Sequence, residues 1–106
     1  MHVVNEVKDL DSLIEAPCLV EEKVEIFKEL AVIVARNSKG ETIAYPTVEM
    51  EFNPTANLVE FLVCPAAISD EVEQVAQAMA KQVIEAYNMT GILAVELFLD
   101  KEGNVL

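Results

Sequence analysis

The sequence predicts an α+β fold in which an antiparallel sheet carries one long helix packed on one face. Short apolar segments alternate with turn residues, as in a series of β-hairpins, and one clear stretch near residues 70–87 has apolar residues at helical spacing. The chain has 106 residues, of which 53% are hydrophobic, so it can bury one core. We therefore expect a single domain over residues 1–106.

The segments before residue 37 supply the expected central strand. Asp9–Glu15 is short and acidic and predicts one or two helical turns, which end at Ala16-Pro17. Cys18–Glu22 predicts a short strand that enters a charged turn. Glu29–Arg36 is apolar on both faces, a pattern typical of a strand covered on both sides, so we expect it at the centre of the sheet.

Two further strands are expected before the helix. Asn37–Gly40 has the composition of a hairpin turn, with Gly40 available for a positive φ angle. Thr42–Glu49 predicts the second strand, Asn53–Asn57 a loop, and Leu58–Val63 the third strand. Hairpin connections of this kind favour antiparallel neighbours.

The predicted long helix begins at Ser69 or Asp70, because either residue can cap a helix and acidic residues fill the first turn. Asn88 suits the C-terminal cap. Thr90–Asp100 then returns to the sheet as a strand, and Lys101–Asn104 forms the next turn. The apolar helix residues at helical spacing are Val72, Val75, Ala76, Met79, Val83 and Tyr87.

The last feature of the sequence is an incomplete hairpin. After the turn at residues 101–104, only Val105 and Leu106 of the returning strand are present. So short an arm leaves backbone N–H and C=O groups of the hairpin without partners. We therefore expect the chain to be a piece of a longer protein.

The composition argues against several kinds of partner. The chain has 7 basic and 19 acidic residues and a net charge of −12, whereas a nucleic-acid surface needs clustered Lys and Arg. No apolar run approaches the roughly 18–20 residues that cross a bilayer. The first residues are short and polar, so we expect no leader peptide. We expect no nucleic-acid or membrane partner and a cytoplasmic location. Cys18 and Cys64 lie in apolar runs without metal-ligand spacing, which predicts free, buried thiols.

Glu96 is the most informative single residue. Strand alternation places it on one face with Ile92, Ala94 and Phe98. A carboxylate among apolar neighbours is costly unless a cation meets it. That cation could be Mg²⁺ on nucleotide phosphates, because Mg²⁺ prefers oxygen ligands. Alternatively, Glu96 reaches solvent or pairs with a lysine, and the pattern alone leaves both interpretations open.

A second group of polar residues surrounds the start of the central strand. The backbone groups of an extended charged turn can read a purine edge, and a following Glu can accept both ribose hydroxyls; a solvated surface loop is the alternative. Arg36 ends the strand and either holds a phosphate or carboxylate or pairs with a neighbouring acid such as Glu49. The residues of the turn and the following acid are Glu21, Glu22, Lys23, Val24 and Glu29.

Four blocks of sequence, in this order and spacing, carry a family resemblance: Cys18–Glu22, Glu29–Arg36, Ala44–Pro46 and Gly91–Phe98. From Cys18 onward the chain resembles the carboxyaminoimidazole ribonucleotide synthetases, the ATPase component of phosphoribosylaminoimidazole carboxylase. These are ATP-grasp ligases, in which two antiparallel α+β layers clamp the nucleotide. The resemblance implies that this chain is a partial ATP-grasp subdomain, the C-terminal nucleotide-binding layer.

The resemblance also implies an activity. Enzymes of this family use ATP and bicarbonate to form carboxyphosphate, which carboxylates aminoimidazole ribonucleotide. By the match, the adenine-reading hinge is formed by Glu21, Glu22, Lys23 and Val24. Glu29 takes the place of the ribose-binding carboxylate and Glu96 that of the first magnesium carboxylate. Arg36 matches a frequent arginine of the family, for which we expect a substrate or phosphate contact.

Two departures limit what this chain can do alone. Met50–Asn53 stands where the family has an Asn and a nucleotide-side His, although Asn53 could supply a polar contact after a small shift. The second metal carboxylate and the phosphate-gripping lysines are absent from the sequence, so we expect this chain alone to be inactive. Another ATP-grasp carboxylating or amide-forming ligase, or a non-enzymatic acidic interaction domain, remains an alternative. We expect a homodimer that pairs sheet edges or an exposed sheet face.

Overall fold

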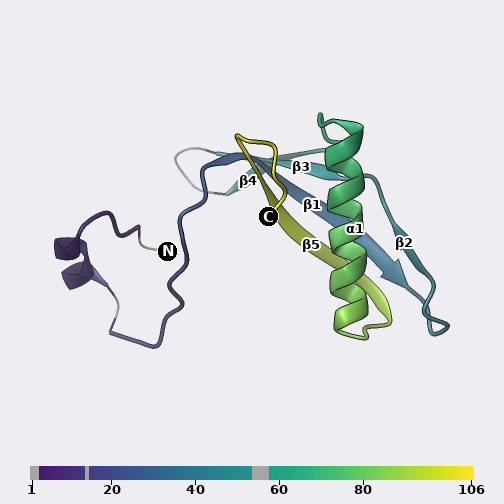
Figure 1. Cartoon of the computed structure of the whole chain (residues 1–106), viewed down its shortest axis with the longest axis horizontal. Coiled ribbons are helices and arrows are strands. Elements are labelled where there is room, and N and C mark those ends of the chain that lie inside the picture. Colours follow the sequence, from purple (N-terminus) through teal and green to yellow (C-terminus); the bar gives the residue numbers. More distant parts are fainter. Residues whose placement is uncertain (1–2, 14, 54–57) are drawn as a thin grey trace.

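The computed structural model describes residues 3–13, 15–53 and 58–106. An antiparallel five-stranded sheet is crossed by one long helix, as predicted (Figure 1). The elements in chain order are η1 (Val7–Ser12), β1 (Ile26–Arg36), β2 (Thr42–Ala44), β3 (Val48–Phe52), β4 (Val59–Val63), α1 (Asp70–Ala86) and β5 (Gly91–Asp100).

The strand β1 is the centre of the sheet, as its two apolar faces predicted. Along one edge it pairs with β5 from Ile26↔Asp100 to Arg36↔Gly91. Along its other edge it pairs first with β2 and then with β3, and β4 lies beyond β3. The strand expected over Thr42–Glu49 is therefore two strands. Pro46 lies between them and has no N–H to donate to a ladder.

Both ends of α1 have the predicted caps. The Ser69 hydroxyl accepts a hydrogen bond from the N–H of Val72 at 3.4 Å. At the other end Asn88 has a positive φ of 46°, and its N–H donates to the carbonyl of Glu85 at 2.8 Å while the N–H of Met89 donates to that of Ile84 at 3.1 Å. This pair of bonds is a Schellman cap. Among the described residues, no helix is long and apolar enough to cross a membrane.

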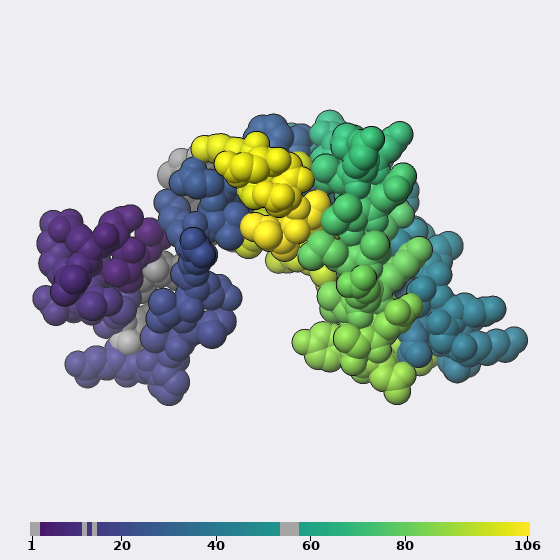
Figure 2. Space-filling view, viewed as in Figure 1, coloured from purple at the N-terminus to yellow at the C-terminus, as the bar shows by residue number. Residues whose placement is uncertain are grey.

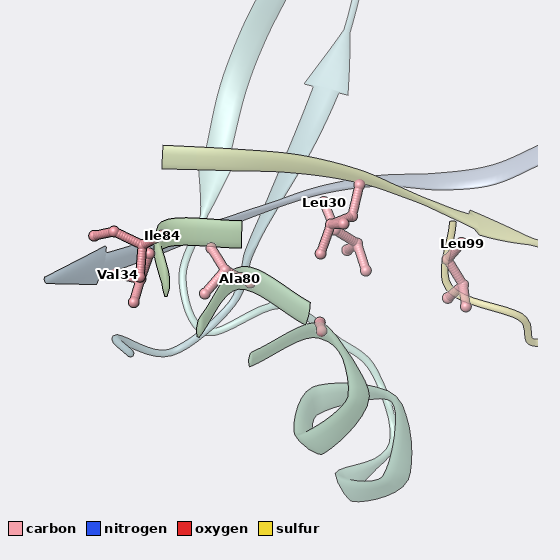
Figure 3. Close-up of a cluster of buried hydrophobic side chains, with 8 residues drawn as sticks. Leu30, Val34, Ala80, Ile84 and Leu99 are labelled. Carbon is pink, nitrogen blue, oxygen red and sulfur yellow. The ribbon is translucent and has the colours of Figure 1, made fainter. Parts of the chain in front are cut away.

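The core lies between α1 and the covered face of the sheet (Figure 3). The helix contributes two alanines, whose small side chains let it lie close to the strands. The expected helix stripe is partly wrong: Val75 and Tyr87 are 46% and 78% exposed. The spacing of apolar residues did not show which side of the helix is most buried. Ala80 and Ile84, which are fully buried, each follow a residue of the predicted stripe by one position. The buried residues are Leu30, Val32, Val34, Ala76, Ala80, Ile84, Leu97 and Leu99.

The described residues before β1 form an arm that lies beside the sheet and helix rather than in them (Figure 2). The strand predicted over Cys18–Glu22 is absent, since no other described strand pairs with it there. The helical turns predicted over Asp9–Glu15 are partly confirmed. The short helix η1 begins two residues earlier, at Val7, and ends at Ser12. Because of the arm, the radius of gyration is 16.4 Å, compared with about 13 Å for a compact chain of this length.

The two cysteines are free, as predicted, but they are exposed rather than buried. Cys18 lies in the arm, and Cys64 follows the edge strand β4. An apolar run predicts burial only where another element covers it. Residues 54–57 of the expected loop lie outside the described residues.

The C-terminal hairpin forms as predicted. The carboxylate of Asp100 accepts hydrogen bonds from the N–H groups of Glu102 and Asn104, at 2.9 and 2.7 Å. Leu106 then exchanges two backbone hydrogen bonds with Phe98, of 2.8 and 2.9 Å. The short returning arm therefore covers part of the outer edge of β5.

Candidate functional site

The sheet has a covered face, which packs on α1, and an open face on its other side. The two faces alternate along β1 and β5, because buried residues such as Leu30 and Leu97 alternate with more accessible ones. We define the open face by the register of the strands. Its residues are Glu29, Ala31, Ile33 and Ala35 of β1, Ile43 of β2, Val48 and Met50 of β3, Leu62 of β4, and Ile92, Ala94, Glu96 and Phe98 of β5.

Two carboxylates lie in the middle of this apolar surface. Glu29 is paired with Met50 on one side and Phe98 on the other. Glu96 is paired with Ala31, two residues further along β1. Glu29 and Glu96 are therefore diagonal neighbours on one face, for which sheet geometry gives roughly 7–8 Å between Cα atoms. The structure thus brings together two acids that are far apart in the sequence.

The surroundings of Glu29 disfavour its charged form. Partial burial raises the pKa of the Glu29 carboxyl, and the negative charge of Glu96 raises it further. Glu29 has no ion pair with a cation within the described part of the chain. A cation or hydrogen-bond donor that approached both carboxylates would relieve this repulsion, which makes the pair a candidate ligand site.

We expect the Glu96→Gln substitution to lower the pKa of Glu29 towards its ordinary value, because one of the two causes of the rise is removed. A raised pKa means that the folded chain loses stability as the pH rises from the pKa of the unfolded chain to that of the folded chain. Glu96→Gln should reduce that loss. Carbon-13 NMR titration of the Glu29 carboxyl measures the shift, and Glu85→Gln on α1 is the control. An unchanged Glu29 pKa in the Glu96 variant would contradict the coupling.

Glu96 lies where strand alternation predicted. It is on the face that α1 does not cover, next to Ala94 and Phe98 of its own strand. Across the described residues it forms no salt bridge and no side-chain hydrogen bond to Lys or Arg. The predicted geometry is confirmed, while a magnesium-binding role stays a prediction.

The predicted adenine-reading segment lies in the arm directly before β1. Glu21, Glu22 and Lys23 are exposed, and Val24 is half-buried. In this part of the described chain these four residues have no backbone hydrogen bond to a helix, strand or turn. Their N–H and C=O groups are therefore available to a ligand, as a purine-reading segment requires, and that role also stays a prediction.

Arg36 lies on the covered face, away from the two carboxylates. Its Nη1 donates to Oδ1 of Asn88 and to the carbonyl of Met89, both at 3.2 Å. The alternative pairing of Arg36 with Glu49 is wrong, because Lys28 occupies both oxygens of Glu49 at 2.6 and 2.7 Å. Arg36 thus binds the residues that follow α1. A substrate or phosphate contact of Arg36 stays a prediction, and it would lie on the covered face and not on the open face.

Sequence reasoning missed the apolar residues that flank Glu29. Met50 and Phe98 lie on either side of it, and Leu62 lies beyond Met50. Together they offer apolar surface on both sides of a hydrogen-bond acceptor. The alternation of Val48, Met50 and Phe52 in the sequence is the signal that could have indicated this face.

The donor set of the open face fits a divalent cation only in part. No cluster of three or more His, Cys, Asp or Glu side chains that could hold a metal is found in the described ranges. The unpaired carboxylate of Glu96 nevertheless suits Mg²⁺, which is held by one or two carboxylates together with nucleotide phosphates. The open face as defined contains no Lys or Arg that would neutralise the phosphates themselves.

Comparisons with known proteins identify the family of this chain. The family model for the ATP-grasp domain matches residues 2–106. The phosphoribosylaminoimidazole carboxylase of Candida albicans is 35% identical over 99 residues, which are 93% of this chain and 17% of that protein. This chain therefore spans about a fifth of the length of the curated relatives that it matches.

Two solved structures are similar over nearly the whole chain. The N5-carboxyaminoimidazole ribonucleotide synthetase of Thermotoga maritima is 42% identical with a TM-score of 0.83, and the match covers 95% of this chain and 26% of that one. The N5-carboxyaminoimidazole synthase of Aspergillus clavatus, solved with ADP and 5-aminoimidazole ribonucleotide, is 31% identical with a TM-score of 0.80, covering 93% and 26%. With a family match over almost its full length, this chain belongs to the ATP-grasp family.

Proposed function

We propose that this chain is the C-terminal nucleotide-binding layer of an ATP-dependent carboxylating ligase that makes carboxyaminoimidazole ribonucleotide. Its substrates would be ATP, bicarbonate and aminoimidazole ribonucleotide. The observation that carries the proposal is the Glu29–Glu96 pair on the apolar open face. It is supported by relatives that are named as synthetases of this product. Because the chain spans only 17–26% of the relatives described above, the complete activity would belong to a larger protein.

Each predicted site residue has a role in this proposal. The exposed backbone of Glu21, Glu22, Lys23 and Val24 would read the edge of adenine. Glu29 would accept hydrogen bonds from the ribose hydroxyls, and their donation would relieve its repulsion from Glu96. Glu96 would be the ligand from this chain to Mg²⁺, which, when bound, would supply positive charge against the charge that develops in phosphoryl transfer.

The apolar neighbours of Glu29 complete the fit to a nucleoside. Phe98, which is 37% exposed, and Met50 lie on either side of the carboxylate. A planar base can bury its faces on such side chains while the sugar reaches the carboxylate. We propose that this row of residues supports the nucleoside, and that phosphate-binding cations come from outside the open face.

Nucleotide titration of the isotope-labelled chain tests this proposal. We expect ADP with Mg²⁺ to bind in the millimolar range, which corresponds to a binding free energy of about 4 kcal/mol. The affinity is low because the chain supplies contacts to the nucleoside but no lysines that bind the phosphates. NMR shift changes should concentrate at Glu29, Glu96 and Phe98. The Glu96→Gln variant should lose the Mg²⁺ dependence, whereas Glu85→Gln on α1 should keep it. Shift changes confined to the covered face, or micromolar affinity, would overturn the assignment of these residues.

We also propose that the chain forms a two-fold homodimer. On the open face, Ile43, Leu62 and Ile92 are 62–67% exposed, and burial of apolar surface contributes about 25 cal/mol per Å². The net charge of −12 opposes association, but salt screens it beyond about 8 Å. Sedimentation at high micromolar concentration should show a dimer, and Leu62→Lys should weaken it. A clean monomer in moderate salt would reject this prediction.

We also propose a cytoplasmic location, and this proposal rests on the sequence alone.

A further inference from the structure

The segment Tyr45–Thr47 contains one extra residue between β2 and β3. Ala44 on β2 is paired with Val34 of β1. If that register continued, Thr47 would be opposite Ala31, but Val48 is opposite Ala31 instead. This is a β-bulge, in which one residue is added to one strand of a pair and the ladder is locally interrupted.

Both the sheet and the helix hold the backbone of this bulge. The N–H of Tyr45 donates to the carbonyl of Ile33 on β1 at 2.9 Å, and the carbonyl of Thr47 accepts from the N–H of Ala66 at 2.8 Å. Thr47 is fully buried, and its N–H donates to Oε1 of Glu73 at 3.0 Å. The side-chain amide of Gln77 donates to the same Oε1 at 2.7 Å and to the carbonyl of Tyr45 at 3.2 Å. Pro46 has no N–H to donate. The bonds from α1 give hydrogen-bond partners to the N–H of Thr47 and the C=O of Tyr45 at this interruption of the ladder.

The register after the bulge decides which side chains reach the open face. In the observed register Met50 is beside Glu29, and Glu49 is on the covered face with Lys28. A slip by one residue would exchange the faces of all residues of β3. Glu49 would then face Glu29, and a third carboxylate would replace the apolar surface of Met50.

We propose that Glu73 is a positioning residue for the open face, although it lies on the other side of the sheet. It acts through the N–H of Thr47, which fixes the bulge and thereby the register of β3. The consequence for nucleoside binding rests on the function proposed above. The consequence for the register does not, so the two can fail separately.

Amide hydrogen exchange and cross-strand nuclear Overhauser effects in the full chain test the register. We expect Glu73→Ala to accelerate exchange at Thr47 by about tenfold and to weaken the contact between the Cα protons of Leu30 and Glu49, which are directly opposite each other. Glu73→Gln keeps an acceptor oxygen and should restore both. Gln74→Ala, on the exposed side of the same helical turn, should change neither. Wild-type protection of Thr47 in Glu73→Ala would overturn the proposal.

If Glu73→Ala does not fold, Gln77→Ala provides the milder test, because it removes the amide that holds the Glu73 carboxylate and keeps the carboxylate itself. We expect exchange at Thr47 to rise several-fold in this variant. Unchanged exchange at Thr47 in a folded Gln77→Ala would then contradict the proposal.

ADP at millimolar concentration separates positioning from a general loss of structure. In Glu73→Ala the ADP-induced shift at the Met50 methyl should disappear, while the shift at Phe98 should remain, because β5 pairs with β1 independently of the bulge. Glu73→Gln should recover the Met50 response. Equal loss at Met50 and Phe98 would reject a positioning role. No ADP response in the unsubstituted chain would refute the nucleotide function and leave the register test intact.

Discussion

Replacing Glu96 by glutamine is expected to lower ligase turnover at least about a hundredfold in a chimera in which this chain replaces the matching quarter of the Thermotoga maritima synthetase. The amide keeps the shape of the side chain and removes the charge that a magnesium ligand supplies. Loss of one electrostatic contact to a developing phosphoryl charge has effects of this size. ADP formation that depends on aminoimidazole ribonucleotide is the measurement.

Two controls make that experiment decisive. The chimera with Glu85→Gln should keep its turnover, since Glu85 is exposed on α1. If turnover of the Glu96 variant stays within a factor of about three of the unsubstituted chimera, Glu96 is not a metal ligand. A folded, unsubstituted chimera that forms ADP without any requirement for aminoimidazole ribonucleotide would favour a different ATP-grasp ligase.

Leu30→Ala is expected to have the largest effect on stability, a loss of about 2–5 kcal/mol in the free energy of unfolding. Leu30 is fully buried between β1 and α1, so its removal leaves a cavity that the tightly paired central strand cannot close. Urea denaturation followed by circular dichroism measures the change.

Ile33→Ala, on the same strand but the open face, is the matched control. Ile33 is 39% exposed, and we expect its truncation to cost roughly 1 kcal/mol, since less apolar surface is lost from a buried site. The two variants are compared at low concentration, below the high micromolar range in which the dimer is expected. Equal losses there would contradict the greater exposure of Ile33 in the folded chain.

Much of the fold could be predicted because its elements are marked locally. The two apolar faces of β1, the cap residues Ser69 and Asn88, and the turn at Asn37–Gly40 each have a physical signature within a few residues. The division of one expected strand at Pro46 was missed. Proline cannot donate a hydrogen bond to a ladder, so an interruption at Pro46 could be expected. The register of the following segment, however, also depends on helix side chains that are distant in the sequence.

The candidate site was predicted less completely than the fold. Alternation within β5 placed Glu96 on one face with Ile92, Ala94 and Phe98, because that inference needs only one strand. The proximity of Glu29 depends on the register of β1 against β5, which no local pattern specifies. Arg36 has the same strand parity as the buried Val34, so its place on the covered face could have been inferred once the helix-covered side of β1 was known.

The pairing of β1 with β5 also has a consequence for synthesis on the ribosome. The hairpin of β1 and β2 joins neighbouring segments and can close as soon as residue 44 is free of the exit tunnel. The other edge of β1, by contrast, waits for residues 91–100. Contacts between distant segments form slowly because a long loop must be closed first. During translation the longest strand therefore has one open edge until the end of this segment, which makes a nascent chain stalled before residue 91 prone to aggregation.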